Sequence, residues 1–337
     1  MKIIIPGGTG HLGRLLAVAF LDAGHEVVVL SRREPAPAGA AGRADARPGD
    51  GRVVCWDGRT LGPWAAEVDG ADAVINLAGR SVNCRYTQRN LQEMMASRID
   101  SATVVGAAIA RAAAPPRVWL QMSTATIYAH SHDQANDEAT GVVGGAEPGV
   151  PAYWAFSVDI ARAWESAQAD APTPRTRKVA LRASMVMAPG RGGAFDMLWR
   201  MARLGLGGPV AGGRQYMSWI HGDDFARAVA LLLAREDLTG PVNLASPEPL
   251  PYRDFMAQLR AAAGVPVGLP ATAWMAELGA FLLRSDTELL LKSRRVVPGR
   301  LLDAGFVFAH PQWQAAARDL VTRSRTRGRA GGVLDAV

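Results

Sequence analysis

Apolar positions in the first half of the chain follow two alternating patterns. Short runs rich in Val, Ile and Leu predict buried strands at Ile3–Ile5, Val27–Leu30, Val53–Trp56, Ala73–Leu77, Val118–Met122 and Val179–Val186. Segments with helical spacing separate them, at Leu12–Ala23, Leu61–Val68, Leu91–Arg111 and Ile160–Gln168. Strands alternating with helices in this way predict an α/β fold, a doubly wound parallel sheet covered by helices on both faces.

The pattern changes after about residue 190. Helical spacing predominates from there to about Leu320, and one apolar run, Val242–Leu244, predicts a further strand. The segment Pro35–Arg52 is rich in Pro, Ala and Gly, which predicts an exposed loop. The arginine-rich end, residues 321–337, is expected to be a flexible tail.

A glycine-rich loop, Gly7-Gly8-Thr9-Gly10-His11-Leu12-Gly13, joins the first predicted strand to the first predicted helix. Glycines at these points permit a tight turn, a close approach of the backbone to a pyrophosphate, and close packing of helix on strand. The N–H groups at the helix start attract phosphates. The loop therefore predicts a Rossmann-type dinucleotide site, with a purely structural turn as the alternative. The residues expected at the cofactor are Gly7, Thr9, Gly10, His11, Leu12 and Gly13.

The two patterns divide the chain. Residues 1–190 are expected to form the dinucleotide-binding Rossmann domain, to which residues 217–245 return. Residues 191–216 and 246–320 are expected to form a smaller, helix-rich substrate lobe.

The end of the second predicted strand should face the adenosine ribose. An NAD-binding protein usually places Asp or Glu there, whereas this chain has Ser31-Arg32-Arg33. A guanidinium can bind a 2′-phosphate with two hydrogen bonds. Arg32 and Arg33 therefore favour NADP(H) over NAD, the alternative being two exposed loop arginines.

The spacing Gly7-x-x-Gly10-x-x-Gly13 resembles that of the extended short-chain dehydrogenases/reductases. The resemblance implies that Asp57 faces the adenine and that Leu77-Ala78-Gly79 lies beside the cofactor. Further segments make the chain similar, over residues 1 to 320, to an atypical, epimerase-like branch of the NAD-dependent epimerase/dehydratase superfamily. That branch is of unknown function and has its own small C-terminal domain. The segments are Arg182-Ala183-Ser184, Ser218-Trp219-Ile220-His221 and Val297-Pro298-Gly299-Arg300-Leu301-Leu302-Asp303-Ala304-Gly305-Phe306.

The catalytic tyrosine and lysine that this superfamily usually carries are missing. They stand four residues apart on one helix, where the ammonium lowers the pKa of the tyrosine for proton exchange. Matched by Trp164-Glu165, the two positions hold Ser157 and Ala161. The lysines of this chain, none of which stands four residues after a tyrosine, are Lys2, Lys178 and Lys292.

Other residues could supply the chemistry. The resemblance implies that Thr124 takes the catalytic Ser/Thr position, with Ser123 beside the cofactor. Tyr128, His130 and His132 follow the fifth predicted strand, at the edge where open α/β sheets bind ligands, and histidine titrates near neutral pH. A polar loop without catalytic function is the alternative. No metal is expected, because the sequence places no third ligand near the two histidines.

A second candidate region follows the glycine-rich segment near residue 210. His221 stands before two aspartates, which could equally cap the following helix. Arg182 and Arg214 could hold an anionic substrate, although a salt bridge inside a strand is an equal alternative for Arg182. Tyr153 and Trp219 could line a substrate pocket, or pack in the core.

Composition changes this picture little. There are 37 basic and 31 acidic residues, but the arginines are scattered, so nucleic acid is not an expected partner. The two cysteines form no disulfide framework, and no apolar run is long enough for a membrane span. We therefore expect a cytoplasmic protein, with a homodimer as one assembly it could form.

The leading hypothesis is an NADP(H)-dependent oxidoreductase or epimerase-like enzyme acting on a small carbonyl or hydroxyl compound. Two alternatives stay open. The chain could bind NADP(H) without turning over a substrate, as a regulator or scaffold. It could also be a redox-neutral isomerase or dehydratase that retains its cofactor.

Overall fold

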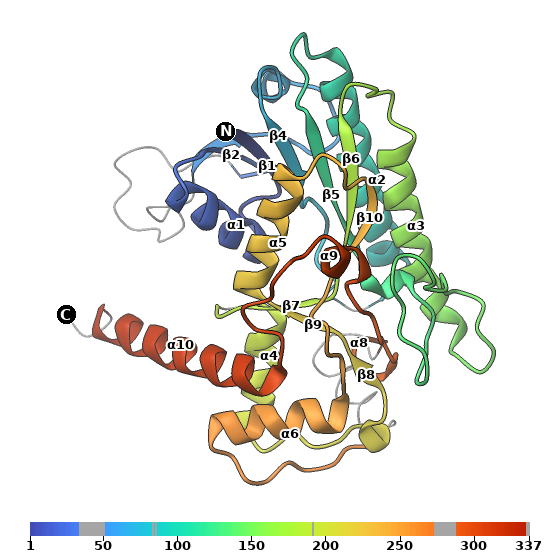
Figure 1. Ribbon diagram of the computed structural model, residues 1–337, viewed down its shortest axis with the longest axis vertical. Coiled ribbons are helices and arrows are strands. Elements are labelled where there is room, and N and C mark those ends of the chain that lie inside the picture. The colour runs from blue at the N-terminus through green and yellow to red at the C-terminus, as the bar shows by residue number, and fades with distance from the viewer. Residues whose placement is uncertain (34–50, 83, 85, 191, 273–287, 335–337) are drawn as a thin grey trace.

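A seven-stranded parallel sheet forms the centre of the molecule, in the order β10-β6-β5-β4-β1-β2-β3 (Figure 1). The computed structural model describes residues 1–33, 51–82, 84, 86–190, 192–272 and 288–334, so most of the predicted loop Pro35–Arg52 lies outside it. The strands are β1 Lys2–Pro6, β2 Glu26–Ser31, β3 Arg52–Cys55, β4 Ala73–Asn76, β5 Val118–Thr124, β6 Arg177–Ala183 and β10 Gly240–Leu244. The predicted α/β fold is confirmed. The strand order reverses between β1 and β4, which is where open α/β sheets bind ligands.

Helices cover both faces of the sheet (Figure 1). Helices α2 (Gln88–Arg111) and α3 (Ala155–Ala169) pack together on one face, and α1 (His11–Asp22) and α5 (Gly222–Ala234) pack on the other. The strands between them are apolar and buried because both faces are covered. Short 3-10 helices at Pro63–Glu67 (η1), Ala125–Ile127 (η2), Ala152–Trp154 (η3) and Ala211–Gly213 (η4) occupy the connections.

The C-terminal half adds a smaller lobe with its own hydrophobic core, centred on Trp219, Phe255 and Trp313. Among the described residues, no helix combines the length and apolarity that a bilayer crossing requires. The described elements of the lobe are two two-stranded pairs and four helices: β7 Met185–Met187 with β9 Trp219–His221, β8 Tyr216–Met217 with β11 Leu250–Pro251, and α4 Ala194–Arg203, α6 Tyr252–Ala263, α8 Glu288–Leu291 and α10 Trp313–Leu334. A short helix, α9 Gly299–Asp303, packs against β10 and the core of the main sheet.

Three local predictions differ from the structure. The predicted strand Val179–Val186 is interrupted at Ser184, whose N–H and hydroxyl both bond the carbonyl of Leu244, so the chain leaves the main sheet there. The predicted helix Leu61–Val68 is the 3-10 helix η1. The expected flexible tail is instead part of α10, which is helical to Leu334. Arg323 in this helix forms an ion pair with Asp223 of α5.

Candidate functional site

The glycine loop between β1 and α1 has the close contacts that its sequence predicts. Gly7 adopts a φ of +77°, and a Cβ there would lie 2.8 Å from the backbone of Ala78. A Cβ on Gly13 would lie 2.4 Å from the Cα of Gly8. Gly10 is the exposed N-cap of α1, and no side chain of a described residue caps it. The first turn of α1 therefore has no side-chain cap among the described residues, and its N–H groups are the kind of donors that bind a pyrophosphate.

The other predicted members of the loop lie around this opening. Thr9 is exposed, and His11 and Leu12 are half-buried. The imidazole of His11 lies against Gly190 and Gly193, so the segment that follows β7 covers the start of α1.

A cavity of about 460 Å³ opens beside the ends of β2 and β3. It brings together two residues that the sequence predicts to bind adenosine, Arg32 and Asp57, while Arg33 is exposed outside the lining. Its walls are Arg32, Cys55, Trp56, Asp57, Thr60, Gly62, Pro63 and Trp64. The rings of Trp56 and Trp64 meet edge-on, with centroids 5.3 Å apart, and give the cavity an aromatic floor.

Asp57 is held as an anion at this cavity. Its carboxylate accepts hydrogen bonds from the Thr60 hydroxyl (2.5 Å) and from the backbone N–H groups of Arg59 (2.8 Å) and Thr60 (2.9 Å). These bonds, led by the Thr60 hydroxyl, lower the pKa of Asp57 to about 2. The site thus offers a carboxylate acceptor beside the Arg32 guanidinium.

The turn after β4 is fixed by Asn76. Its side-chain oxygen accepts the N–H of Ala78 (3.1 Å), and its amide donates to Gln121 on β5 (2.9 Å). Leu77 and Ala78 are half-buried and Gly79 is exposed, so this turn borders the same edge of the sheet as the glycine loop.

Ser123 and Tyr128 belong to a buried polar network. The Ser123 hydroxyl donates to Glu165 (2.6 Å), and Glu165 accepts two hydrogen bonds of 2.9 Å from Arg182. Arg182 also donates to the Tyr128 hydroxyl (3.0 Å), which donates to Asn243 (2.9 Å). Burial raises the pKa of Tyr128. The sequence left two roles open for Arg182, a contact to a substrate anion or a salt bridge inside the protein. The structure shows the salt bridge, with Glu165.

Thr124 ends β5 and is half-buried; its hydroxyl lies 3.0 Å from that of Thr126. His130 is half-buried, and its Nδ1 accepts the N–H of Ser293 (3.0 Å). Burial lowers the pKa of His130. His132 is exposed and meets the His130 ring edge-on, with centroids 4.9 Å apart.

Sequence reasoning missed a buried group beside η2. Ser157, in the first turn of α3, donates a hydrogen bond to Glu288 of α8. Glu288 is 2% exposed and lies 3.6 Å from the ammonium of Lys292, which is 1% exposed and donates to the carbonyl of Thr126 (3.0 Å). The available signal was an acidic residue four positions before one of three lysines in an arginine-rich chain.

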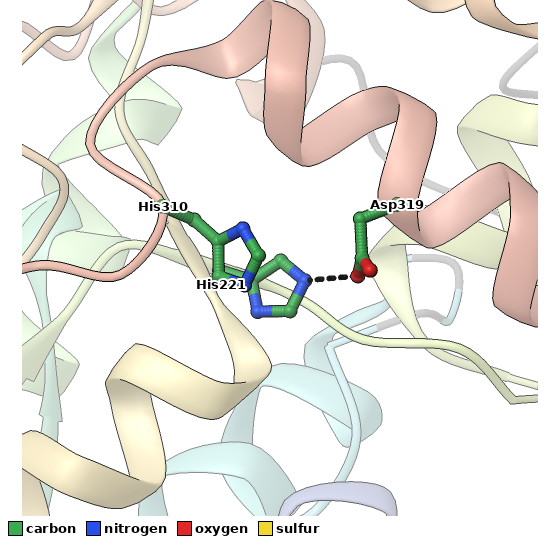
Figure 2. Close-up of side chains that lie close together, drawn as sticks. All are labelled: His221, His310 and Asp319. Carbon is green, nitrogen blue, oxygen red and sulfur yellow. Dashed lines mark hydrogen bonds and ion pairs between the residues drawn. The ribbon is translucent and has the colours of Figure 1, made fainter.

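His221 lies in a second cluster, with His310 and Asp319 (Figure 2). Its Nδ1 accepts the N–H of Asp223 (3.1 Å), so a neutral ring carries its proton on Nε2 and donates it to Asp319 (3.1 Å). A metal ion on Nε2 would have to displace that proton. The arrangement instead caps α5 and joins it to α10, so His221 itself, rather than either aspartate, is the capping residue.

The other residues that the sequence predicts to bind substrate differ in exposure and do not line one common pocket among the described residues. Tyr153 and Arg214 are exposed, on η3 and after η4 respectively. Trp219 is fully buried: its ring packs against Trp313, and its Nε1 donates to the carbonyl of Glu248 (3.2 Å). Trp219 is therefore a core residue of the smaller lobe rather than a pocket wall.

Comparisons with known proteins place this geometry in a family. The sequence profile of the NAD dependent epimerase/dehydratase family matches residues 3–245. The chain belongs to this family. A second profile, a domain of unknown function called DUF1731, matches residues 271–320. The predicted atypical branch, with its own C-terminal domain, is confirmed.

Relatives in this epimerase/dehydratase family span the whole chain. Human epimerase family protein SDR39U1 is 29% identical over 326 residues, which are 95% of this chain and 100% of the human one. An epimerase family protein of Mycobacterium tuberculosis, MT2273, is 30% identical over 316 residues, or 91% of this chain and 93% of that protein.

Solved structures agree. A crystal structure of human SDR39U1 (isoform 2) with NADPH superposes with a TM-score of 0.80 at 27% identity, covering 96% of this chain and 99% of that one. The UDP-N-acetylglucosamine 4-epimerase of Bacillus cereus superposes with a TM-score of 0.70 at 16% identity, covering 96% and 99% of the two chains, and supports the fold alone.

Proposed function

We propose that this protein binds NADP(H) along the carboxyl edge of its sheet. In this proposal it acts as an oxidoreductase or epimerase-like enzyme on a small carbonyl or hydroxyl compound. The observation that carries the proposal is the cavity beside β2 and β3, where Arg32 and Asp57 face one space. A 2′-phosphate requires a cation at this place, and the adenine amino group requires an acceptor. The relative crystallised with NADPH supports this choice of cofactor.

The described residues fit the remaining parts of the cofactor. Gly7, Gly10 and Gly13 leave room for a pyrophosphate at the start of α1, since a Cβ on Gly10 would meet only the Gly7 carbonyl, at 3.4 Å. The turn Leu77–Gly79 and the end of β5 at Thr124 lie further along the same edge. When bound, the nicotinamide supplies a hydride donor or acceptor, and the chain holds the substrate and moves its proton.

For the substrate side, we propose that Thr124 hydrogen-bonds the carbonyl or hydroxyl oxygen. Thr124 is half-buried at the carboxyl end of β5; its hydroxyl lies 3.0 Å from that of Thr126 and accepts the Thr126 N–H (3.1 Å). His130, whose lowered pKa keeps it neutral at pH 7, is the second group near this edge that can exchange a proton.

A fluorescence titration with NADPH and with NADH tests the proposal. We expect the wild-type protein to bind NADPH more tightly, and Arg32→Ala to lose about 10- to 100-fold in NADPH affinity, the value of a charge-assisted hydrogen bond. NADH affinity should stay unchanged in that variant. Arg33→Ala is the matched control, because Arg33 does not line the cavity.

A wild-type protein that binds neither dinucleotide would contradict the proposal. Binding of NADPH without turnover of any carbonyl or alcohol in a broad screen would instead favour a cofactor-reading regulator. The missing Tyr/Lys pair is the observation that keeps this second function in view.

A further inference from the structure

A buried carboxylate of the C-terminal region, paired with a lysine, reaches the helix that should carry the missing catalytic pair. Ser157 occupies the position of the tyrosine on α3, and its hydroxyl bonds Glu288. A serine is shorter than a tyrosine by an aromatic ring, so this position leaves room that a side chain from another element can enter. Glu288 enters it from α8, 131 residues further along the chain.

The group lies at the reaction end of the sheet. Lys292 donates to the carbonyl of Thr126 in η2, the turn that directly follows β5 and Thr124. The carboxyl end of β5 borders the point where parallel sheets bind ligands. The three side chains differ in burial: Ser157 is half-buried, whereas Glu288 and Lys292 are almost fully enclosed.

Structural stability alone does not account for this arrangement. Burying an ion pair in place of apolar side chains generally costs stability, and Arg294, also buried, adds a second cation whose pKa burial lowers. Buried charges that cost stability are frequent at functional sites, which makes this group a candidate for one. The cation at position 292 is a lysine, although the chain has only three lysines among 37 basic residues. An ammonium can release a proton at accessible pH, whereas a guanidinium cannot.

We propose that Glu288 and Lys292 replace the missing Tyr/Lys pair as the acid–base pair of the reaction centre, acting on the substrate through the Ser157 hydroxyl. This inference rests on the proposed function. Ser157 is then the catalytic residue, and Glu288 and Lys292 are positioning residues that supply and hold its proton.

The chemistry balances without a further reactant. In the alcohol-to-carbonyl direction, the substrate hydroxyl gives its proton to the Ser157 oxygen while Ser157 gives its own proton to the Glu288 carboxylate. The substrate C–H bond breaks, and its electron pair leaves as the hydride that NADP⁺ accepts, so the C–O bond becomes a carbonyl. In the opposite direction, protonated Glu288 returns the proton through Ser157 as NADPH gives the hydride. Lys292 keeps its own proton and stabilises Glu288 whenever Glu288 is in its carboxylate form, before it accepts the proton or after it returns it.

A binding measurement that needs no substrate tests the charges. The nicotinamide ring is positive in NADP⁺ and neutral in NADPH, whereas the rest of the cofactor is identical. A carboxylate near the ring therefore favours NADP⁺. We expect Glu288→Gln to weaken NADP⁺ relative to NADPH by about 3- to 10-fold, as for charges that interact through partly screened protein. Lys292→Met should shift the ratio the opposite way, and the double variant should return it towards the wild-type value.

Glu67→Gln is the matched control, since it removes an ion-paired carboxylate on η1, beside Lys2 and Arg52 at the amino ends of β1 and β3. It should leave the ratio unchanged. Because Glu288→Gln leaves a buried ammonium without its partner, the melting temperature of each variant is measured as well, and the double variant removes both charges if the single one unfolds.

Equal losses of NADP⁺ and NADPH affinity, or an unchanged ratio in all three variants, would overturn the proposal and make the pair a structural contact. Failure of the wild-type protein to bind either form would instead contradict the proposed function itself.

The hydroxyl is tested by turnover of carbonyl compounds with NADPH. Ser157→Ala should lower kcat at least 100-fold with unchanged NADPH affinity, and Ser157→Thr, which keeps the hydroxyl, should restore most of it. A Ser157→Ala variant with wild-type kcat would overturn the role of Ser157. Wild-type protein that binds NADPH but reduces no carbonyl would overturn proton transfer by the whole group.

Discussion

The half of the site proposed to bind adenosine is built from residues close in sequence, whereas the proposed reaction half joins residues as far apart as Thr126 and Lys292, separated by 166 positions. Arg32 and Asp57 follow neighbouring strands, and the glycine loop is one continuous turn. The reaction half combines β5, η2, α3 and α8. A site built locally should lose binding without global unfolding, and one built from distant segments should couple its chemistry to the stability of the whole fold.

The largest effect should come from Gly13→Ala. The new Cβ would meet the Gly8 backbone at 2.4 Å, so the loop and α1 must separate. We expect NADPH affinity to fall at least 100-fold and the unfolding free energy to fall by about 2 kcal/mol, the typical cost of overpacking. Titration and thermal melting measure the two effects.

Gly24→Ala is the control for that variant. Gly24 also has a positive φ, +79°, but a Cβ there meets nothing within 4 Å. Its backbone strain should cost about 1 kcal/mol with normal binding. Normal NADPH binding by Gly13→Ala would show that the close packing of this loop is not required.

Glu165→Gln should have the largest effect on stability alone, without the loss of NADPH affinity expected of Gly13→Ala. It removes the carboxylate from Arg182, whose side chain is 11% exposed, and leaves a largely buried guanidinium without its ion pair. We expect a loss of about 3 kcal/mol in unfolding free energy, measured by denaturant titration. Glu67→Gln, at the exposed Arg52 pair, should cost less than about 1 kcal/mol. Similar values for the two variants would show that burial of the Arg182–Glu165 pair adds nothing to its contribution.

Tyr128→Phe should have a smaller effect of about 1–2 kcal/mol, because the buried Asn243 oxygen loses its donor. NADPH affinity should not change. The same variant examines the predicted role of Tyr128 as a proton donor, since that role requires kcat to collapse while stability changes little. A Tyr128→Phe protein that is stable but inactive would support the predicted role of Tyr128 as a proton donor.

The smallest effect concerns the pH dependence of His221, whose ring caps α5 and bonds Asp319 of α10. Burial lowers the pKa of His221 in the folded protein. As the pH falls through about 6.5, this histidine is therefore protonated in the unfolded chain while it stays neutral in the folded one. Stability should therefore be complete above pH 6.5 and decrease as the pH falls towards the folded-state value. His310, Asp223, Asp319 and Arg323 surround the ring and modulate this response.

His221→Asn keeps a side-chain cap on α5 but cannot titrate in this range. Its melting temperature should change less between pH 7 and pH 5 than that of the wild-type protein. Identical pH profiles would place the acid sensitivity elsewhere.

The sequence by itself determined the sheet and the glycine loop, and it singled out Arg32 and Asp57, which the structure brings to one cavity. These features depend on short-range rules: apolar period, glycine where a Cβ collides, and charge at the end of a strand. It also showed that the Tyr/Lys pair is absent, which is a fact of spacing alone.

Only the tertiary structure decided what stands in the place of that pair. Trp219, His221 and Arg182 each fit two interpretations from sequence, and packing, capping and pairing with Glu165 selected one for each. The group Ser157, Glu288 and Lys292 has no local signature beyond a four-residue spacing. The physical reason is that folding decides which side chains are buried and which ones meet. Ser157 and Glu288 are 131 positions apart, so no short window of sequence contains both.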